Sequence, residues 1–289
     1  MTQPSLDRRR HVFRPDLAAE SLRGRVEAGR FVTGRPHQLI RASVPMRAQP
    51  SAAAGLDTEV LFGEVVTVYD VADGWAWGQL DRDGYVGYVP ADALSVDVTP
   101  AAHRVSAIGT FVYSAADIKS PPLMHLSINS RLAVAETDDR FVRLAQGGYV
   151  VGRHIAARDK PARDFVEIGE RLIGTPYLWG GRTRIGIDCS GLLQTAMEAA
   201  GLACPRDSDM QKAEIGADVP IPDPLDGLQR GDLVFWRGHV GIMTDSVMLL
   251  HANAHHMAVI AEPLVNAAQR IARTGSTITA IKRPATLAA

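Results

Sequence analysis

Cys189 is one of two cysteines in the chain, and its sequence position gives it the surroundings of a nucleophile. It lies at the start of a predicted helix that Gly201 ends. A cysteine in the first helical turn lies at the positive end of the helix dipole, among unpaired backbone N–H groups that favour the nucleophilic thiolate. The same N–H groups can stabilise an oxyanion on an attacked carbonyl. The other cysteine, Cys204, lies in a loop without this setting, and the plainer alternative for either is a buried, inert side chain.

Two histidines further along the chain are spaced so that they can meet. His239 begins a predicted strand, 239–243, and His251 lies near the end of the next one, 247–252. If these strands pair as a hairpin around a three-residue turn, the two histidines face each other directly on the same side of the sheet. One imidazole can then act as base for Cys189 while the other orients it. The spacing does not rank which histidine is the base, and the plainer alternative is a pair of ordinary strand-end histidines.

A zinc site is a sharper alternative for the same residues. Two histidines and a cysteine are valid zinc ligands. The further candidates are His255 and His256, which we expect in an exposed loop. Because no fourth ligand has the spacing of a zinc motif, we expect neither a metal nor another cofactor.

Composition excludes several classes of protein. The chain has 289 residues, a formal charge of −1, 46% hydrophobic and 22% charged residues. It can therefore bury a core, and it is not a general nucleic-acid binder. Two cysteines exclude a disulfide-stapled scaffold and a cysteine-rich zinc module. The length suggests two or three domains.

Residues 36–98 and 99–158 have the pattern of two small all-β barrels. The first contains short β-rich runs broken by turn signals at Asp73-Gly74 and Asp83-Gly84. The second repeats this pattern, with a turn at Asp138-Asp139. Both carry a Gly-Tyr-Val stretch near their ends, and these runs resemble bacterial SH3-like domains.

Residues 159–289 change character. A helical pattern ends at Gly174, a second helical pattern follows Cys189, and β-rich runs occupy 232–236, 239–243 and 247–252. Helices followed by strands indicate an α+β domain.

Residues 1–35 hold eight arginines and four acidic residues. We expect a solvated arm that docks on the rest of the protein. Arg8, Arg9 and Arg10 prompt the question of a twin-arginine signal, but no apolar stretch of the required length follows them. The chain also has no apolar run long enough to span a membrane. The expectation is a cytoplasmic protein without a membrane partner.

Five linked motifs in the last domain carry a family resemblance. In order and spacing they resemble the NlpC-type cysteine peptidases of bacterial cell-wall metabolism. The motifs are Tyr177-Leu178-Trp179-Gly180-Gly181, Asp188-Cys189-Ser190-Gly191-Leu192, Gly231-Asp232-Leu233-Val234-Phe235, His239-Val240-Gly241-Ile242 and His251-Ala252. The resemblance implies a papain-like core with Cys189 as nucleophile, His239 as general base and His251 as the orienting third member.

Two SH3-like domains before such a domain resemble the γ-D-glutamyl-L-diamino-acid endopeptidases. Those enzymes cleave the bond between γ-D-Glu and the diamino acid of a murein stem peptide with a free N-terminal L-Ala. The resemblance implies that Asp188, Ser190 and Ser208 contact the amine end of the ligand. A carboxylate beside the nucleophile can select an ammonium group by a charge-assisted hydrogen bond. The plainer role of Asp188 is a helix N-cap, and the two roles can coexist.

The same resemblance implies further contacts with the substrate. It places Tyr177 on the wall of the active site. It also implies that the first barrel lends a tyrosine and a glutamate, for which Tyr85 and Glu64 are the candidates. Tyr88 and Glu59 compete with them, and spacing does not decide between the pairs.

The sequence therefore predicts a cytoplasmic cysteine endopeptidase that recycles murein tripeptides or tetrapeptides. The alternatives are a non-catalytic module that binds wall peptide or protein, and an exported wall hydrolase. The identity of the diamino acid, the oligomeric state and the role of the N-terminal arm stay open.

Overall fold

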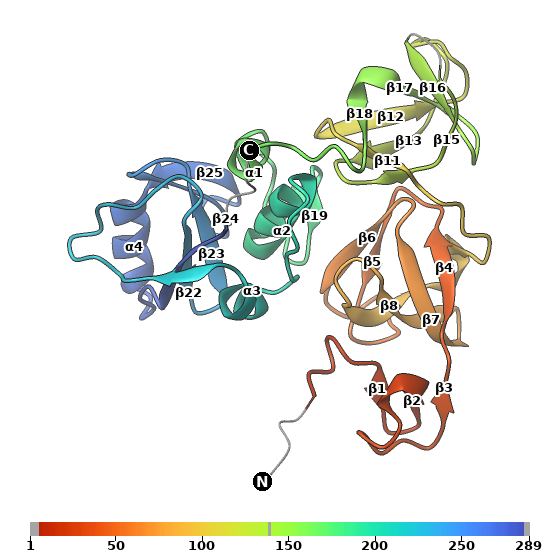
Figure 1. Cartoon of the computed structure of the whole chain (residues 1–289), viewed down its shortest axis with the longest axis horizontal. Helices are drawn as coiled ribbons and strands as arrows, with labels where there is room; N and C mark the ends of the chain where they lie inside the picture. The colour runs from red at the N-terminus through yellow and green to blue at the C-terminus, as the bar shows by residue number, and fades with distance from the viewer. Residues whose placement is uncertain (1–5, 138–139, 286–289) are drawn as a thin grey trace. The chain divides into compact units, whose positions relative to one another are not determined.

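The protein divides into two compact units, Met1–Ala157 and Arg158–Ala289, in a computed structural model that describes residues 6–137 and 140–285 (Figure 1). The predicted start of the last domain, residue 159, lies next to this division. The turn expected at Asp138-Asp139 lies outside the described residues. Within those residues no helix has the length and apolar character needed to cross a membrane.

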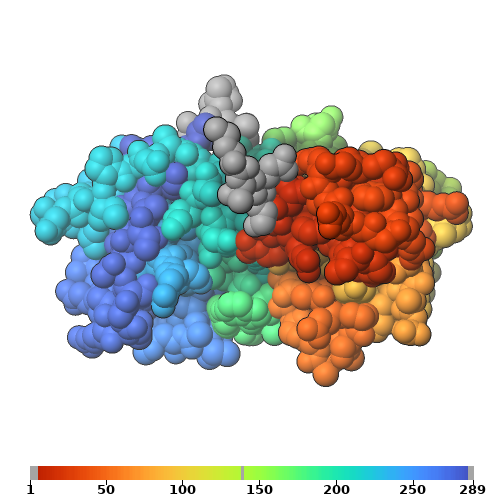
Figure 2. Space-filling model, turned by 90° about the horizontal axis from the view of Figure 1, so that it is seen from below, coloured from red at the N-terminus to blue at the C-terminus, as the bar shows by residue number. Residues whose placement is uncertain are grey.

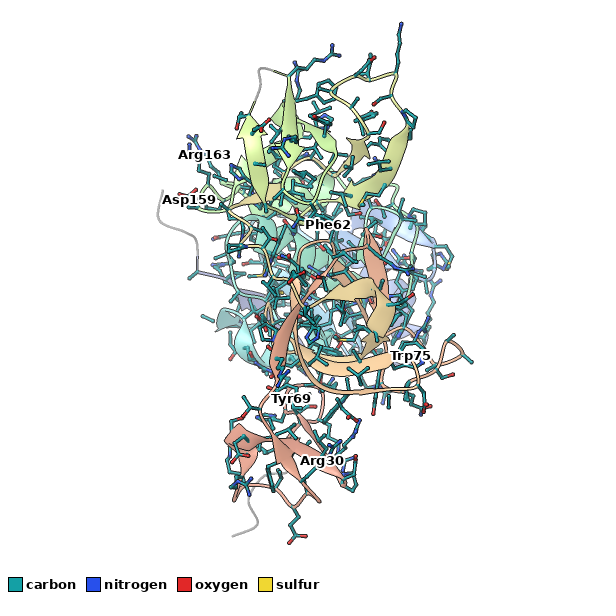
Figure 3. All side chains as sticks on the ribbon, turned by 90° about the vertical axis from the view of Figure 1, so that its right-hand side faces the viewer. Arg30, Phe62, Tyr69, Trp75, Asp159 and Arg163 are labelled. Carbon is teal, nitrogen blue, oxygen red and sulfur yellow. The ribbon has the colours of Figure 1, made fainter. Side chains whose placement is uncertain are left out.

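The segment before the first barrel is folded. Its elements are β1 (Phe13–Arg14), β2 (Leu17–Ala19), the 3-10 helix η1 (Glu20–Leu22) and β3 (Phe31–Val32). β2 pairs with both other strands, and Leu17 and Leu22 share one apolar cluster with Trp77 and Val86 of the barrel. Figure 3 shows Arg30 on this segment and Tyr69 on the barrel next to it. The segment docks as expected, but it is not a solvated arm, because it has buried side chains of its own.

The first barrel combines a sheet in the order β10-β4-β7-β8-β9 with the pair β5-β6. Its strands are β4 (Arg35–Leu39), β5 (Ser43–Met46), β6 (Thr58–Leu61), β7 (Val65–Ala72), β8 (Trp75–Leu80), β9 (Val86–Pro90) and β10 (Leu94–Ser95). The hairpin between β7 and β8 turns at Asp73-Gly74, where both residues have the positive φ that a tight turn of this kind requires.

The second barrel repeats the first, as the sequence pattern predicts. Its strands are β11 (His103–Val105), β12 (Gly109–Tyr113), β13 (Pro122–Ser127), β14 (Arg131–Leu132), β15 (Val134–Thr137), β16 (Phe141–Leu144), β17 (Tyr149–Val151) and β18 (Ile155–Ala157). Each barrel ends in a strand, a 3-10 turn (η2, Ala91–Ala93; η3, Gly152–His154) and a short last strand. In both barrels that last strand, β10 or β18, pairs with the first, β4 or β11.

Phe62 joins the two barrels into one packed body. Its ring belongs to the apolar core cluster of the second barrel, and its carbonyl oxygen accepts the Arg131 N–H at 2.8 Å (Figure 3). The next residue, Gly63, has φ +75°, and a Cβ there would lie 2.1 Å from the Arg131 carbonyl oxygen. Only glycine therefore fits this junction.

The C-terminal unit is an α+β domain. Its helices are α1 (Phe165–Glu170), α2 (Cys189–Ala199), α3 (Ser208–Glu214) and α4 (Leu264–Ala272). A main sheet runs in the order β21-β26-β22-β23-β24-β25, and β19 pairs with β20. These strands are β19 (Arg182–Thr183), β20 (Gly186–Ile187), β21 (Ala217–Val219), β22 (Leu233–Trp236), β23 (His239–Met243), β24 (Met248–Asn253), β25 (Ala258–Pro263) and β26 (Ala280–Arg283). α2 packs against β23 and β24, while α4 packs against β24 and β25 (Figure 1).

Asp232 anchors the central strands of this sheet. The connection from β21 to β22, residues 220–232, runs over the surface of the unit and is drawn in cyan in Figure 2. Where it ends, the fully buried carboxylate of Asp232 accepts two hydrogen bonds from Arg283, both 2.7 Å long. The Asp232 of the predicted Gly-Asp-Leu-Val-Phe motif thus ties the start of β22 to the end of β26.

The predicted register between the two histidine strands is wrong by two residues. Met243 pairs with Leu249, not with Val247. The cause is the turn: the Asp245 carboxylate accepts the N–H groups of Val247 and Met248 at 2.7 and 2.8 Å, which holds Val247 in the loop. His239 therefore does not face His251 directly. A shift of two residues nevertheless leaves every side chain on its expected side of the sheet.

Candidate active site

Cys189 is the first residue of α2, as predicted, and it is buried. Asp188 caps the helix, because its Oδ1 accepts the Gly191 N–H at 2.6 Å. This confirms the plainer role expected for Asp188. A Cβ at Gly191 would lie 2.2 Å from the Gly181 carbonyl oxygen, so the first turn of α2 requires glycine there.

The thiol of Cys189 lies at the end of β23 that carries His239. Backbone N–H groups of Val240 and Ser190 hydrogen-bond to the sulfur and act to lower its pKa. Because Val240 directly follows His239, the nucleophile candidate and the first histidine come together. This proximity depends on the packing of α2 against β23.

The surroundings of Cys189 favour a neutral thiol over the thiolate expected from the helix N-terminus. Burial and the neighbouring Asp188 carboxylate raise the pKa of Cys189 to about 12. Burial, together with His251, lowers the pKa of His239 to about 3. Removal of the thiol from water thus outweighs the helix dipole and the backbone donors. Both shifts favour a neutral thiol beside a neutral imidazole.

His239 and His251 are in direct contact despite their shifted register. His239 Nε2 lies 2.9 Å from His251 Nδ1. His251 is fully buried on β24, where it pairs with Ile260 of β25. Its Nε2 lies 2.8 Å from Oε1 of Glu262, and Glu262 is paired with Arg270 of α4. Burial lowers the pKa of His251 to about 4, against the opposing effect of Glu262.

Asp188 is held by an arginine that sequence reasoning missed. Arg206 Nη2 donates to Oδ2 at 2.8 Å, and Arg206 Nη1 donates to Oδ1 at 3.0 Å. The Gly180 N–H adds a further bond to Oδ2 at 2.7 Å. The available signal was the position of Arg206, two residues before Ser208, in a stretch that the resemblance had already placed near Asp188.

Ser190 and the start of α3 lie beside this ion pair. The Ser190 hydroxyl accepts from Arg206 Nη1 at 2.7 Å and donates to Asp188 Oδ1 at 3.2 Å. Gln211 of α3 donates to the Ser190 carbonyl oxygen at 2.9 Å. The half-buried Ser208 is the first residue of α3. The structure thus brings the segment that carries Ser208 to the start of α2.

Tyr177 lies beside the nucleophile candidate, as expected. Its N–H donates to the Met257 carbonyl oxygen at 2.9 Å. Burial and the neighbouring Cys189 and Asp188 raise the pKa of its half-buried phenol above the usual value. At neutral pH this phenol keeps its proton and can serve as a hydrogen-bond donor.

Comparison with known proteins identifies both kinds of domain. Residues 174–272 match the model described as the NlpC/P60 family. The protein carries an NlpC/P60 domain. Residues 46–94 match the model described as a bacterial dipeptidyl-peptidase SH3 domain. The predicted resemblance to SH3-containing NlpC/P60 proteins is confirmed, and the protein is a cysteine peptidase with a papain-like α+β domain after its SH3-like part.

Relatives and solved structures match this chain over most of its length. A gamma-D-glutamyl-L-lysine dipeptidyl-peptidase of Bacillus subtilis is 29% identical over 225 residues, which are 68% of this chain and 72% of the relative. Dipeptidyl-peptidase 6 of Lysinibacillus sphaericus is 27% identical over 231 residues, covering 71% and 83%. The crystal structure of an NlpC/P60 family protein from Bacillus cereus has a TM-score of 0.72 at 20% identity, covering 86% and 99%. This last likeness shows the fold.

The two glutamate candidates of the first barrel differ in their surroundings. The Glu64 side chain is fully buried: Oε2 accepts the Leu61 N–H at 2.8 Å, and Oε1 lies 3.0 Å from Nε of Arg82. Glu59 is half-buried, and the Ser43 hydroxyl donates to it at 3.4 Å. Both belong to the N-terminal unit, so a role of either in the NlpC/P60 site stays a prediction.

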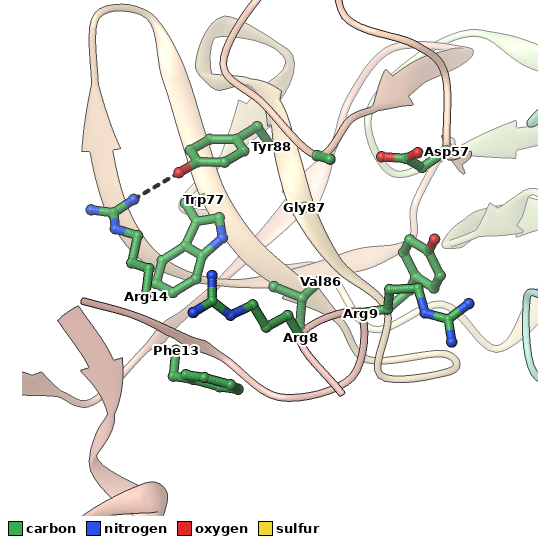
Figure 4. Close-up of a pocket in the computed structure, with 11 residues that line it drawn as sticks. Arg8, Arg9, Phe13, Arg14, Asp57, Trp77, Val86, Gly87 and Tyr88 are labelled. Carbon is green, nitrogen blue, oxygen red and sulfur yellow. Dashed lines mark hydrogen bonds between the residues drawn. The ribbon is translucent and has the colours of Figure 1, made fainter. Parts of the chain in front are cut away.

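The two tyrosine candidates line one cavity of about 480 Å³ in the N-terminal unit (Figure 4). Tyr85 is buried, whereas Tyr88 is half-buried and accepts a hydrogen bond from Arg14 Nη1 at 3.1 Å. The Arg14 guanidinium also lies 4.5 Å from the centre of the Trp77 ring. Side chains of the segment before the first barrel and side chains of the barrel thus line this cavity together. A contact of either tyrosine with the substrate stays a prediction.

The remaining candidates are His255, His256 and Cys204. His255 and His256 are exposed in the turn before β25, as expected. Cys204 is half-buried, and Gln211 donates to its sulfur at 3.4 Å. Among residues 6–137 and 140–285, no group of three or more His, Cys, Asp or Glu side chains is arranged to hold a metal ion.

Proposed function

We propose that the protein is a cysteine endopeptidase that cleaves the γ-D-glutamyl–diamino acid bond of murein peptides with a free N-terminal L-Ala. One observation carries the catalytic part: Cys189 begins α2 next to β23, where His239 and His251 contact each other at 2.9 Å. The substrate class is supported by the relatives named as gamma-D-glutamyl-L-lysine dipeptidyl-peptidases.

The proposed reaction begins with a proton transfer. His239 Nε2 is committed to His251, so Nδ1 is the nitrogen left to accept the thiol proton as sulfur attacks the carbonyl carbon. Backbone N–H groups at the start of α2 stabilise the oxyanion of the tetrahedral intermediate. The imidazolium then gives its proton to the departing amine of the diamino acid, and water hydrolyses the thioester through the same base.

Selection of a free amine is the finer part of the proposal. Five donors already surround the Asp188 carboxylate, from Gly180, Gly191, Ser190 and both Nη atoms of Arg206. An ammonium group must therefore replace the weakest of them, which is the Ser190 hydroxyl at 3.2 Å. That hydroxyl can rotate and accept from the ammonium, and Ser208 can add a second acceptor. An acylated amine carries no charge and fewer protons, so this site disfavours it.

The test compares free L-Ala-γ-D-Glu-diaminopimelate with its N-acetylated form, with products measured by mass spectrometry. We expect hydrolysis of the free tripeptide alone, and no hydrolysis of either peptide by Cys189→Ala. Equal turnover of both peptides would contradict the proposed selection of a free amine. Activity retained in Cys189→Ala would contradict the assignment of the nucleophile.

We further propose that the enzyme acts in the cytoplasm on recycled peptides. A requirement for a free amine supports this role, because L-Ala in intact murein is amide-linked and uncharged. Cell fractionation with an antibody against the chain tests the location, with a cytoplasmic and a wall-associated protein as markers. Recovery with the wall marker would favour an exported hydrolase.

A further inference from the structure

His251 Nε2 has two neighbours that make opposite demands on it. Glu262 Oε1 lies at 2.8 Å and Asn253 Nδ2 lies at 3.0 Å. The carboxylate can only accept a proton, whereas the amide nitrogen can only donate one. A neutral imidazole therefore satisfies Glu262 when Nε2 carries the hydrogen, and satisfies Asn253 when it does not.

Both neighbours are held in place by other groups. Asn253 Oδ1 accepts the His256 N–H at 2.8 Å, which turns the amide nitrogen toward His251. Glu262 accepts two bonds from Arg270, from Nη1 to Oε2 at 2.7 Å and from Nη2 to Oε1 at 2.5 Å. Neither side chain can rotate to relieve the competition without losing its own partner.

The outcome at Nε2 decides which nitrogen of His239 is free. If Nε2 of His251 donates to Glu262, its Nδ1 accepts from Nε2 of His239, and Nδ1 of His239 keeps a lone pair. If Nε2 of His251 instead accepts from Asn253, the hydrogen of His251 lies on Nδ1 and donates to Nε2 of His239. His239 then carries its hydrogen on Nδ1 and cannot take the proton of Cys189.

We propose that Glu262, held by Arg270, is a positioning residue that orders the protons of His251 and His239 so that His239 can act as base. This inference rests on the proposed function, because it requires His239 to accept the thiol proton. The place of Glu262 in the sheet suits this role. It lies on β25 two residues beyond Ile260, the partner of His251, and so on the same face of the sheet.

Two further observations support this assignment. Burial acts to raise the pKa of Glu262, but its hydrogen bonds with Arg270 and His251 lower it to about 2, so the side chain stays an acceptor at neutral pH. A hydrogen bond to a charged acceptor is about twice as strong as one between neutral groups. Both favour the contact with Glu262 over the contact with Asn253.

Glu262 also stabilises the charge that forms during the reaction. When His239 takes the proton, the carboxylate stabilises the imidazolium, and Arg270 partly opposes this effect. The charged and titratable groups that act on His251 are His239, Glu262, Arg270 and His256. Loss of Glu262 lowers the pKa of the coupled histidines, and loss of Arg270 raises it.

The experiment measures kcat and KM for the free tripeptide from about pH 3 to pH 9, because the pKa values of His239 and His251 lie at about 3 and about 4. We expect Glu262→Gln to lower kcat by about 10- to 100-fold with little change in KM, as for other partners that orient a functional histidine. The acid limb of the pH profile should move to lower pH in Glu262→Gln and to higher pH in Arg270→Gln. Glu170→Gln and Arg230→Gln, which break a half-exposed ion pair elsewhere in the unit, are matched controls without effect.

A rescue variant separates positioning from folding. Asn253→Asp places a carboxylate where the amide nitrogen faces His251, and it keeps an acceptor for the His256 N–H. In the Glu262→Gln background it should restore kcat by about tenfold. Thermal melting of each variant shows whether the fold is intact.

The outcomes distinguish this inference from the proposed function. If Cys189→Ala is inactive while Glu262→Gln keeps the kcat and acid limb of the unmodified enzyme, the inference is overturned and the proposed function stands. If Glu262→Gln loses activity together with its melting transition, and Asn253→Asp restores neither, Glu262 is only structural. If Cys189→Ala stays active, the proposed function fails first.

Discussion

Arg206 and Asp188 form a buried two-pronged ion pair directly before the nucleophile candidate. The two nitrogen–oxygen distances are 2.8 and 3.0 Å, and Arg206 is 1% exposed. The pair fixes the carboxylate that caps α2, and so it fixes where the first turn of α2 places Cys189. The same ion pair thus stabilises the start of α2 and holds Cys189 in its place in the site.

Replacing Arg206 with methionine should destabilise the protein by about 3–5 kcal/mol, because it leaves the Asp188 carboxylate buried without its partner. Urea unfolding measures the loss. Arg230→Met is the matched control: Arg230 is 39% exposed and its ion pairs contribute less than about 1 kcal/mol. Equal losses in the two variants would show that the Asp188 carboxylate finds another partner or admits water.

Alkylation of Cys189 should depend on His239. Burial raises the pKa of the thiol to about 12, so the helix N-terminus alone does not supply thiolate at neutral pH. We expect His239→Ala to slow the reaction of Cys189 with iodoacetamide by about tenfold or more, since the base is lost. Mass spectrometry of the labelled peptides gives the rate, and Cys204 in the same sample is the internal control. An unchanged alkylation rate at Cys189 would indicate that the helix dipole, and not His239, makes the thiol reactive.

Local sequence was enough to find the nucleophile candidate and the general fold. The cap, the cysteine and the end of the helix all lie between Asp188 and Gly201, so their relation does not depend on distant contacts. The repeated Gly-Tyr-Val stretches likewise predicted the second barrel. The folded N-terminal segment was missed, because its core depends on Trp77 and Val86, about 60 residues away in the sequence.

The partners of the candidate residues were not predictable in the same way. Glu262 reaches His251 only through the pairing of β25 with β24, and no motif in the sequence marks the register of that pairing. The hairpin register was misjudged because Asp245 draws Val247, which is 57% exposed, into the turn. A side-chain hydrogen bond to the backbone thus decided a register that hydrophobic alternation leaves open.

The buried neutral state of His251 should make stability depend on pH. Its pKa is about 4 in the folded protein, below the ordinary value of 6.5. Between pH 4 and pH 6.5 the unfolded chain binds a proton at His251 that the folded protein does not bind. The contribution of the neutral imidazole to the free energy of unfolding is therefore complete above pH 6.5 and is lost as the pH falls toward 4. The effect is on the order of 3 kcal/mol. Urea unfolding at several pH values between these limits should show a slope that His251→Gln reduces; an identical slope in the variant would exclude His251 as its source.

Truncation of Leu17 should show that the N-terminal segment is part of the folded unit. Leu17 is fully buried in the cluster that contains Trp77 and Val86. Leu17→Ala should therefore cost about 2–5 kcal/mol, the range for cavities left in a packed core. Val96→Ala, at a position that is 72% exposed, is the control and should change stability by less than about 0.5 kcal/mol. Urea unfolding gives both values, and trypsin should cleave the arginine-rich segment faster in Leu17→Ala. If both variants unfold at the same urea concentration and the segment is cleaved equally fast, it does not contribute to the core of the unit.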